Sequence, residues 1–516
     1  MTSAKKILNA LLITAMLATS IPACADDTAT PPELPAMTQG QPPEGMGAPP
    51  NGQPPMGTPP SGGPGGQMGT PPDGAPGGMM GGPGGGSSQP ESYDAVVTVS
   101  EGETAVTEDI ASTGTDENAL LVDGGSATAD GVTITRESSD STGGDSASFY
   151  GVGAAVLVTD GDVTVENATI TTDAAGGAGV FAYGSGVATV KNTAITTKQG
   201  TSGGIHVAGG GTLVAENCTV ETYGGSAAAI RSDRGSGSMT VSGGTYTAHG
   251  SGSPAVYVTA DISIENAELN ATGSEALCLE GLNAVRLYNC TLTGSMPDQE
   301  QNDNTWTVIL YQSMSGDAQV GEGSFLMDGG SLISENGGLF YTTNTDSVFT
   351  LRNVSITAAD DCEYFLRVTG NSNQRGWGAS GANGANCVFT GIAQEMNGDI
   401  LWDSISTLNL YVTEGSVLTG AVIDDETHAG SGGDGSCTVT IDAASTWVVT
   451  SDSTVTTLHC AGTIVDVNGA SVTIRDANGA VLQQGNSLYT ITVDSFDTEA
   501  DCSGAGTVDT FAEHRV

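Results

Sequence analysis

The chain has 516 residues, of which 76 are glycine and only 5% are aromatic. It carries 59 acidic side chains against 13 lysines and arginines, which gives a formal net charge of −46. So acidic a surface repels the phosphates of nucleic acids and of anionic lipids, and we therefore exclude a nucleic-acid partner.

The first 24 residues have the pattern of a signal peptide. Lys5 and Lys6 precede an apolar run over residues 7–21, which is too short to span a bilayer as a mature helix. The run ends in Ile-Pro-Ala-Cys, which is similar to the lipobox of bacterial lipoproteins and predicts lipidation of Cys24. Ordinary signal-peptide cleavage, which would release a secreted protein, is the alternative. We expect an extracytoplasmic protein at the cell surface that meets the membrane only through its N-terminal lipid.

Residues 25–94 have the composition of a disordered linker. The tract over residues 29–91 contains 17 of the 20 prolines, many of them in pairs, with glycine and methionine between them. Such a sequence cannot build a hydrophobic core and is typical of a tether. We expect this tether to hold the following domain away from the membrane.

A short phrase recurs through the rest of the chain. Copies such as VTVENATIT and VRLYNCTLT place an asparagine between two strand-like segments. Asparagine tolerates the left-handed backbone conformation of a tight bend, and Gly243 and Gly329 occupy the same place in two further copies. With one exception, neighbouring copies lie about 23–26 residues apart, which predicts a solenoid of stacked coils. The asparagines of this ladder are Asn167, Asn192, Asn217, Asn266, Asn289 and Asn353.

We therefore expect an all-β fold, a parallel β-helix with this asparagine ladder over residues 95–400. Looser coils should follow over residues 401–516, and the final 20 or so residues should cap them. The pattern resembles the pectate-lyase-like superfamily of right-handed parallel β-helices, and the later coils resemble the strand ladders of bacterial adhesins. The resemblance implies that the turn asparagines point inward and that their amides bond to one another.

Two short motifs resemble those of polygalacturonases, which share this fold. They are Asn344-Thr345-Asp346 and Asp360-Asp361. The motifs lie 14 residues apart, which is shorter than one coil, so their carboxylates cannot stack as equivalents on successive coils. We therefore predict no catalytic residue.

The candidate ligand-binding residues lie on the first strand of successive coils. Alternation along these strands predicts outward aromatic, basic and acidic side chains, a set that suits stacking on sugar rings and hydrogen bonding to hydroxyls. The alternative is that the aromatic side chains only cover the sheet and bind no ligand. The candidates are Phe181, Tyr183, His206, Arg231, Asp233, Tyr257 and Arg367, with Arg234 just beyond them and Trp377 in a glycine-rich insertion.

Three insertions break the repeat, over residues 136–150, 294–306 and 370–386. Loops at a corner of a solenoid disturb the coils little and often build binding sites. If the three converge beside the first strands they make a cleft, and if they disperse they leave a bare rod.

The cysteines allow two disulfides between neighbouring coils. Cys362 and Cys387 lie 25 residues apart, and Cys437 and Cys460 lie 23 apart, which is close to one coil. Burial of these cysteines as small core residues is the alternative. No cluster with the spacing of a metal site is present, and we expect no required cofactor, although aspartate-rich turns leave Ca²⁺ as an option.

The sequence thus predicts an exported bacterial cell-surface protein that is adhesin-like or carbohydrate-binding, non-catalytic and monomeric. Its expected partner is an extracellular or surface glycan. One alternative is a polysaccharide lyase or glycoside hydrolase acting on uronate-containing polymers. Another is a structural protein of the envelope with no defined ligand.

Overall fold

The computed structural model describes residues 88–516. The expected signal peptide, the lipidation site Cys24 and most of the expected linker lie outside the described residues. Tyr93, at the end of that linker range, already contacts the folded part, because its hydroxyl donates to the carbonyl of Tyr150 at 3.0 Å. Within residues 88–516, no helix is long and apolar enough to cross a membrane.

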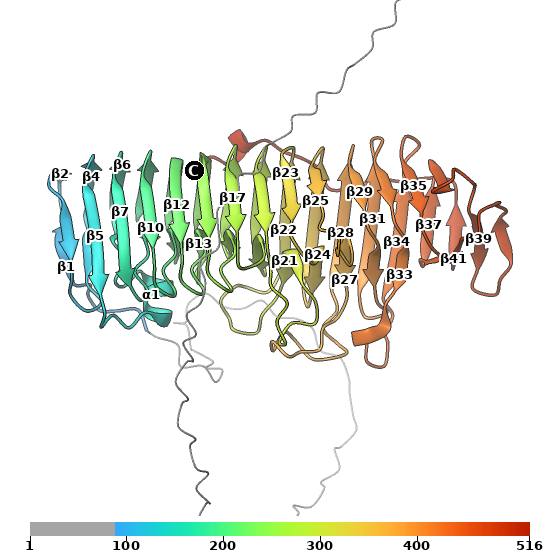
Figure 1. The fold of residues 1–516 in the computed structure, drawn as a ribbon, viewed down its shortest axis with the longest axis horizontal. Coiled ribbons are helices and arrows are strands. Elements are labelled where there is room, and N and C mark those ends of the chain that lie inside the picture. The colour runs from blue at the N-terminus through green and yellow to red at the C-terminus, as the bar shows by residue number, and fades with distance from the viewer. Residues whose placement is uncertain (1–87) are drawn as a thin grey trace, which may run out of the picture. The chain divides into compact units, whose positions relative to one another are not determined.

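The described residues form a parallel β-helix, as the sequence predicts. Short strands from successive coils pair in parallel and build three faces, which Figure 1 shows as a row of stacked coils. Among the named strand pairs, only β39 (Thr473–Asp476) and β40 (Val481–Gln483) run antiparallel, near the C-terminal end of the row.

The first face carries the predicted binding strands. Its strands are, in stacking order, β1 (Ala95–Val99), the first part of β4 (Asn118–Asp130), the first part of β6 (Val156–Glu166), β8 (Val180–Tyr183), β11 (Ile205–Ala208), β13 (Ile230–Ser232), β15 (Val256–Val258), β18 (Leu277–Glu280), β21 (Trp306–Tyr311), β24 (Gly338–Thr343), β27 (Leu366–Val368), β30 (Ile400–Trp402) and β33 (Val422–Asp424).

The second face precedes the asparagine corner. Its strands are β2 (Glu103–Val106), the last parts of β4 and β6, β9 (Val187–Lys191), the first parts of β12 (Thr212–Thr222) and β14 (Ser238–Ala248), β16 (Asp261–Glu265), β19 (Ala284–Tyr288), β22 (Glu322–Asp328), β25 (Asp346–Arg352), β28 (Asn386–Ile392), β31 (Thr407–Thr413), β34 (Ser436–Ile441), β37 (Thr457–Cys460) and β42 (Ser495–Asp497).

The third face follows that corner. Its strands are β3 (Ile110–Ser112), β5 (Thr133–Ser138), β7 (Thr169–Ala174), β10 (Ala194–Thr197), the last parts of β12 and β14, β17 (Glu268–Ala271), β20 (Thr291–Gly294), β23 (Ser331–Ser334) and β26 (Ser355–Thr357). A separate parallel stack follows, formed by β29 (Glu395–Asn397), β32 (Val417–Thr419), β35 (Thr446–Val449) and β38 (Thr463–Asp466). Near the end, β36 (Ser453–Thr454) and β39 both pair with β41 (Thr490–Val493).

The core is a set of columns in which like residues stack from coil to coil. Ile195 pairs with Ile170 on one side and with Val220 on the other, and all three side chains are buried. Larger rings fill the interior further along, where neighbouring phenylalanine centroids lie 5.4–6.1 Å apart. Each such ring stabilises the fold by roughly 2–3 kcal/mol relative to an exposed one. These rings belong to Phe325, Phe340, Phe349, Phe365 and Phe389.

The repeat asparagines occupy the left-handed turn between the second and third faces. All six have φ between 47° and 53°, and Gly243 and Gly329 take the same conformation at φ 66°. Their expected inward orientation is wrong, because all six are exposed. The residue that follows fills the interior at this corner, as Cys290 does, and the asparagine therefore points out. The amides still stack between some coils, with Nδ2 of Asn289 donating to Oδ1 of Asn266 at 2.8 Å.

The C-terminal segment does not stop at the last coil, where a cap was expected. It runs back along the second face, and Figure 1 shows it, with the helical turn η2 (Phe511–His514), along the edge of the coils opposite to α1 (Gly144–Tyr150). The hydroxyl of Tyr288 donates to Oδ1 of Asp509 at 2.6 Å, and Arg515 pairs with Glu265 at 3.3 Å. The ring of Phe511 packs on Tyr288 and Leu326, two outward apolar side chains that would otherwise face water.

The two expected disulfides are not formed, and all eight cysteines within residues 88–516 are free. For Cys437 and Cys460, the reason is the register of the paired strands. The carbonyl of Cys437 accepts from the amide of Thr456, whereas Cys460 lies opposite Ile441, four positions further along the strand. Cys387 faces the core, and Cys362 is a half-buried loop residue that packs at its edge.

Candidate functional site

The predicted first-strand residues form one outward column. Phe181, His206, Arg231 and Tyr257 are paired in register on β8, β11, β13 and β15, so their side chains project on the same side of successive coils. Arg367 belongs to the same column four coils further on.

This column is covered, and not open as expected. Phe181 is fully buried, His206 is 1% exposed, and Tyr183 and Tyr257 are half-buried. The cover at the N-terminal end is α1, which lies in the first insertion. Helix α1 ends at Gly151, whose φ is 76°. A Cβ atom at this position would lie 2.5 Å from the Leu157 side chain, so glycine lets the end of α1 pack closely on the first face.

A buried ionic cluster fixes α1 to the column. Nε of Arg231 donates to Oδ2 of Asp233 at 2.7 Å, and Nη2 of Arg231 donates to Oγ of Ser148 on α1 at 3.0 Å. Burial alone would raise the pKa of the Asp233 carboxyl, but Arg231 and His206 hold it below its usual value. Burial lowers the pKa of His206 to about 4, although Oδ2 of Asp233 lies 3.2 Å from its Nε2. The ion pair is therefore the charged part of this cluster at neutral pH.

A second ion pair lies beside this cluster. Arg234 lies over the ring of Phe149 on α1, 4.2 Å from its centroid, and its Nη2 donates to Oδ1 of Asp317 at 2.7 Å. Asp317 belongs to the connection between β21 and β22. Segments from three distant parts of the sequence thus meet at this point of the first face.

The insertions converge and leave a groove between them. One cavity, of about 320 Å³, lies beside α1 and is lined by Arg231, Asp233 and Asp317 among others. A second, of about 210 Å³, lies beside the two later insertions. Both are lined by Ser226 and Tyr257, so they lie side by side. We call the two cavities together the groove.

Aromatic rings form the wall of the groove at its second cavity. Trp377 lies 4.5 Å from Tyr311 and 6.0 Å from Trp306, measured between ring centroids. Behind this wall, the buried carboxylate of Glu280 accepts from the hydroxyls of Tyr257 at 3.1 Å and Tyr311 at 3.2 Å. Burial raises the pKa of Glu280. Glu280 therefore orients two rings of the wall without lining the groove itself.

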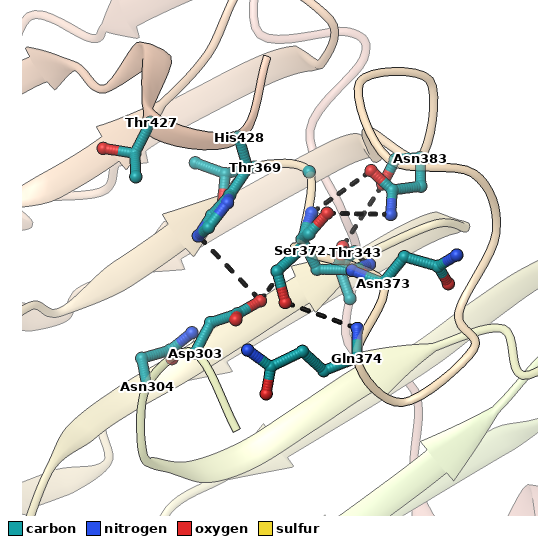
Figure 2. A network of polar contacts seen from close by, with 12 residues as sticks. Asp303, Asn304, Thr343, Thr369, Ser372, Asn373, Gln374, Asn383, Thr427 and His428 are labelled. Carbon is teal, nitrogen blue, oxygen red and sulfur yellow. Dashed lines mark hydrogen bonds and ion pairs between the residues drawn. The ribbon is translucent and has the colours of Figure 1, made fainter. Parts of the chain in front are cut away.

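A polar network locks the second and third insertions together, as Figure 2 shows. The carboxylate of Asp303 accepts from the backbone amide of Ser372 at 2.7 Å and lies 3.9 Å from Nε2 of His428. Nδ2 of Asn383 donates to the carbonyl of Trp377 at 2.9 Å. These bonds fix the loop that carries Trp377.

The structure divides the predicted site residues into two groups. Arg231, Asp233, Tyr257 and Trp377 line the groove, and Arg234 pairs with Asp317 at its wall. The other four lie outside it. Phe181 and His206 are buried under α1, Tyr183 packs on Tyr150, and Arg367 pairs with Asp425 at 2.9 Å.

Sequence reasoning missed several lining residues. Trp306 ends the second insertion and begins β21, and Tyr311 ends that strand. Alternation from Ile309, which pairs with Cys278 in the outward column, could have suggested Tyr311. Ser148, Glu275 and Asp317 come from connections whose placement no local pattern specifies.

Within residues 88–516, no group of three or more His, Cys, Asp or Glu side chains is placed to hold a metal ion. Comparison of the chain with protein-family models gives no match, and comparison with curated proteins gives none either.

Proposed function

We propose that this protein binds a glycan in the groove and acts as a non-catalytic, adhesin-like protein on the outside of a bacterial cell. The observation that carries the proposal is the wall formed by Trp306, Tyr311 and Trp377 beside Tyr257. Flat rings suit the apolar faces of sugars, and the cavity of about 320 Å³ is in the usual range for small-molecule sites, with the one of about 210 Å³ adjoining it.

Polar groups at the rim suit sugar hydroxyls. Asp145 and Gln299 lie at the lips of the two cavities, and Glu275 lies in the second. Carboxylates and amides accept hydrogen bonds from hydroxyls, which is how a polar ligand is oriented in an otherwise apolar site. The rigid coils beneath hold rings and polar groups at fixed spacing, which reduces the ordering cost of binding.

A lyase or glycoside hydrolase is the alternative, and the charges favour it less. Hydrolysis of a glycosidic bond normally uses two carboxyl groups that face the substrate. In the groove, Asp233 is paired with Arg231 and Asp317 with Arg234. The other two carboxylates, Asp145 and Glu275, line different cavities and so do not form a facing pair. Glu280, whose pKa is raised, is 1% exposed behind the tyrosines. Export and lipid anchoring complete the proposal and rest on the N-terminal sequence pattern.

The test is a glycan array followed by calorimetry with the purified protein. We expect Trp377→Ala to weaken binding about tenfold, the usual scale for a stacked ring. Tyr223→Ala is the matched control, because Tyr223 is a 47% exposed aromatic that lines neither cavity. Equal loss in both variants would contradict a site in the groove, and absence of binding across the array would favour a structural envelope protein. Release of unsaturated or reducing products from a bound polysaccharide would favour the enzyme.

A further inference from the structure

Hydrogen-bond donors without a partner gather at one end of the groove. Nε1 of Trp306 and Nδ2 of Asn302 make no hydrogen bond within the described part of the chain. Trp306 is 3% exposed. Both residues line one small cavity, which shares Trp306 and Trp377 with the groove.

The direction of the Asn302 amide is fixed by its neighbour. Nε of Arg375, which can only donate, bonds to Oδ1 of Asn302 at 2.7 Å. The amide nitrogen of Asn302 must therefore point the other way. Together with the indole N–H of Trp306, it forms a pair of donors at the cavity that no acceptor of the described chain satisfies. Buried donors left unpaired are costly, so the acceptor at such a place comes from an ordered water in the free protein or from a ligand that displaces it.

The size and charge of this cavity limit the kind of chemical group that it can hold. Its volume is about 10 Å³, which is room for a single oxygen atom and not for a whole carboxylate or phosphate. The carboxylate of Asp303 also lines it, and the net charge of the chain is −46, so an anion is disfavoured on both counts. A neutral carbonyl oxygen meets these conditions. The rings of Trp306 and Trp377 beside it suit a small apolar group attached to that carbonyl.

The acetamido group combines such an oxygen with such a methyl group. We propose that the groove recognises N-acetylated amino sugars, with the acetamido oxygen accepting from Trp306 Nε1 and Asn302 Nδ2 and the methyl group lying against the tryptophans. This inference rests on the proposed glycan-binding function and specifies its ligand class.

Three tetrasaccharides that differ only at C2 test the inference. They are the β-1,4-linked tetramers of N-acetylglucosamine, glucosamine and glucose, measured by calorimetry on the full chain. We expect the acetylated tetramer to bind about tenfold more tightly than the other two, the value of one or two good hydrogen bonds. Equal affinity for acetylated and glucose tetramers, or preference for the amine or for an oligouronate, would overturn the inference while glycan binding stands. Failure of every glycan to bind would instead contradict the proposed function itself.

A pair of conservative variants isolates the indole N–H. Trp306→Phe keeps a ring but removes the donor, and we expect the ratio of the affinities for the acetylated and glucose tetramers to fall from about ten to about one, whatever affinity both tetramers lose in common. Trp306 is buried, so the smaller ring also loses packing, and the thermal unfolding midpoint is measured to show that the variant is folded at the temperature of the assay. Trp377→Phe is the control and should weaken both tetramers alike. Retention of the preference in Trp306→Phe would contradict the assigned contact.

Discussion

Acidification should loosen the first face through a single buried histidine. The ring of His206 lies 4.0 Å from that of Phe181 and is covered by α1, and burial lowers its pKa to about 4. In the unfolded chain the same side chain takes up a proton near pH 6.5. The folded state therefore excludes a proton that the unfolded state accepts, so the free energy of unfolding falls as the pH drops from about 6.5 towards about 4.

The size of the effect follows from those two values. One pH unit of difference corresponds to about 1.4 kcal/mol, so the full window is worth about 3 kcal/mol. Between pH 7 and pH 5 the same relation gives a loss of about 2 kcal/mol. Asp233 and Arg231, the charged neighbours of the ring, should keep their charges over this range, since Arg231 and His206 hold the pKa of Asp233 below its usual value against the effect of burial.

Native-state hydrogen exchange over β8, β11 and β13 measures the loss, because a solenoid opens locally and not as one unit. Protection free energies, corrected for intrinsic exchange, are compared at pH 7 and pH 5 for the wild-type protein and His206→Gln. Groups such as Glu280, whose pKa is raised by burial, act in the opposite direction but are present in both proteins. We expect the wild-type protein to lose about 2 kcal/mol more than the variant. The same pH dependence in both proteins, and in His206→Asn, would refute the reasoning.

Two further predictions concern the coil corner and the C-terminal segment. Asn289 has φ 53°, which a β-branched side chain tolerates poorly, so Asn289→Val should lower the free energy of unfolding by about 1–2 kcal/mol or more. Asn289→Gly should lower it by less than about 1 kcal/mol. Urea unfolding compares the two variants, and equal losses would contradict a left-handed turn. Phe511→Ala removes a ring that is 7% exposed and should speed proteolysis of residues 499–516 while leaving the strands protected. Unchanged cleavage would show that Phe511 does not hold this segment.

The parts of the fold that repeat were predictable because their causes are local. A left-handed residue every 23 to 26 positions, with alternating apolar residues between, specifies the coil, and the structure places Asn167 and Asn353 in that conformation. The inward direction came from resemblance to a superfamily and was wrong. The small apolar residues that follow the asparagines, such as Cys218, already fill the interior at that corner.

The covers of the faces were not predictable, because they depend on contacts between distant segments. Arg231 meets Ser148 across 83 residues, and Tyr288 meets Asp509 across 221. Alternation identifies Phe181 as outward, but only the placement of α1 turns an outward ring into a buried one. The three insertions could be predicted as loops near the first strands, whereas the residues they bring to the groove could not.

The charges around the groove connect its architecture to the ligand class that we propose. The chain has only 13 lysines and arginines, and those at the first face hold its parts together. Arg231 and Arg234 engage Asp233 and Asp317, and Arg375 engages Asn302. Arg231 donates from all three of its nitrogens within the described chain, which leaves it little capacity for an anionic ligand. In the proposed site, recognition would fall to rings and to neutral donors such as the indole N–H of Trp306, and for this reason we propose a neutral sugar and not a uronate.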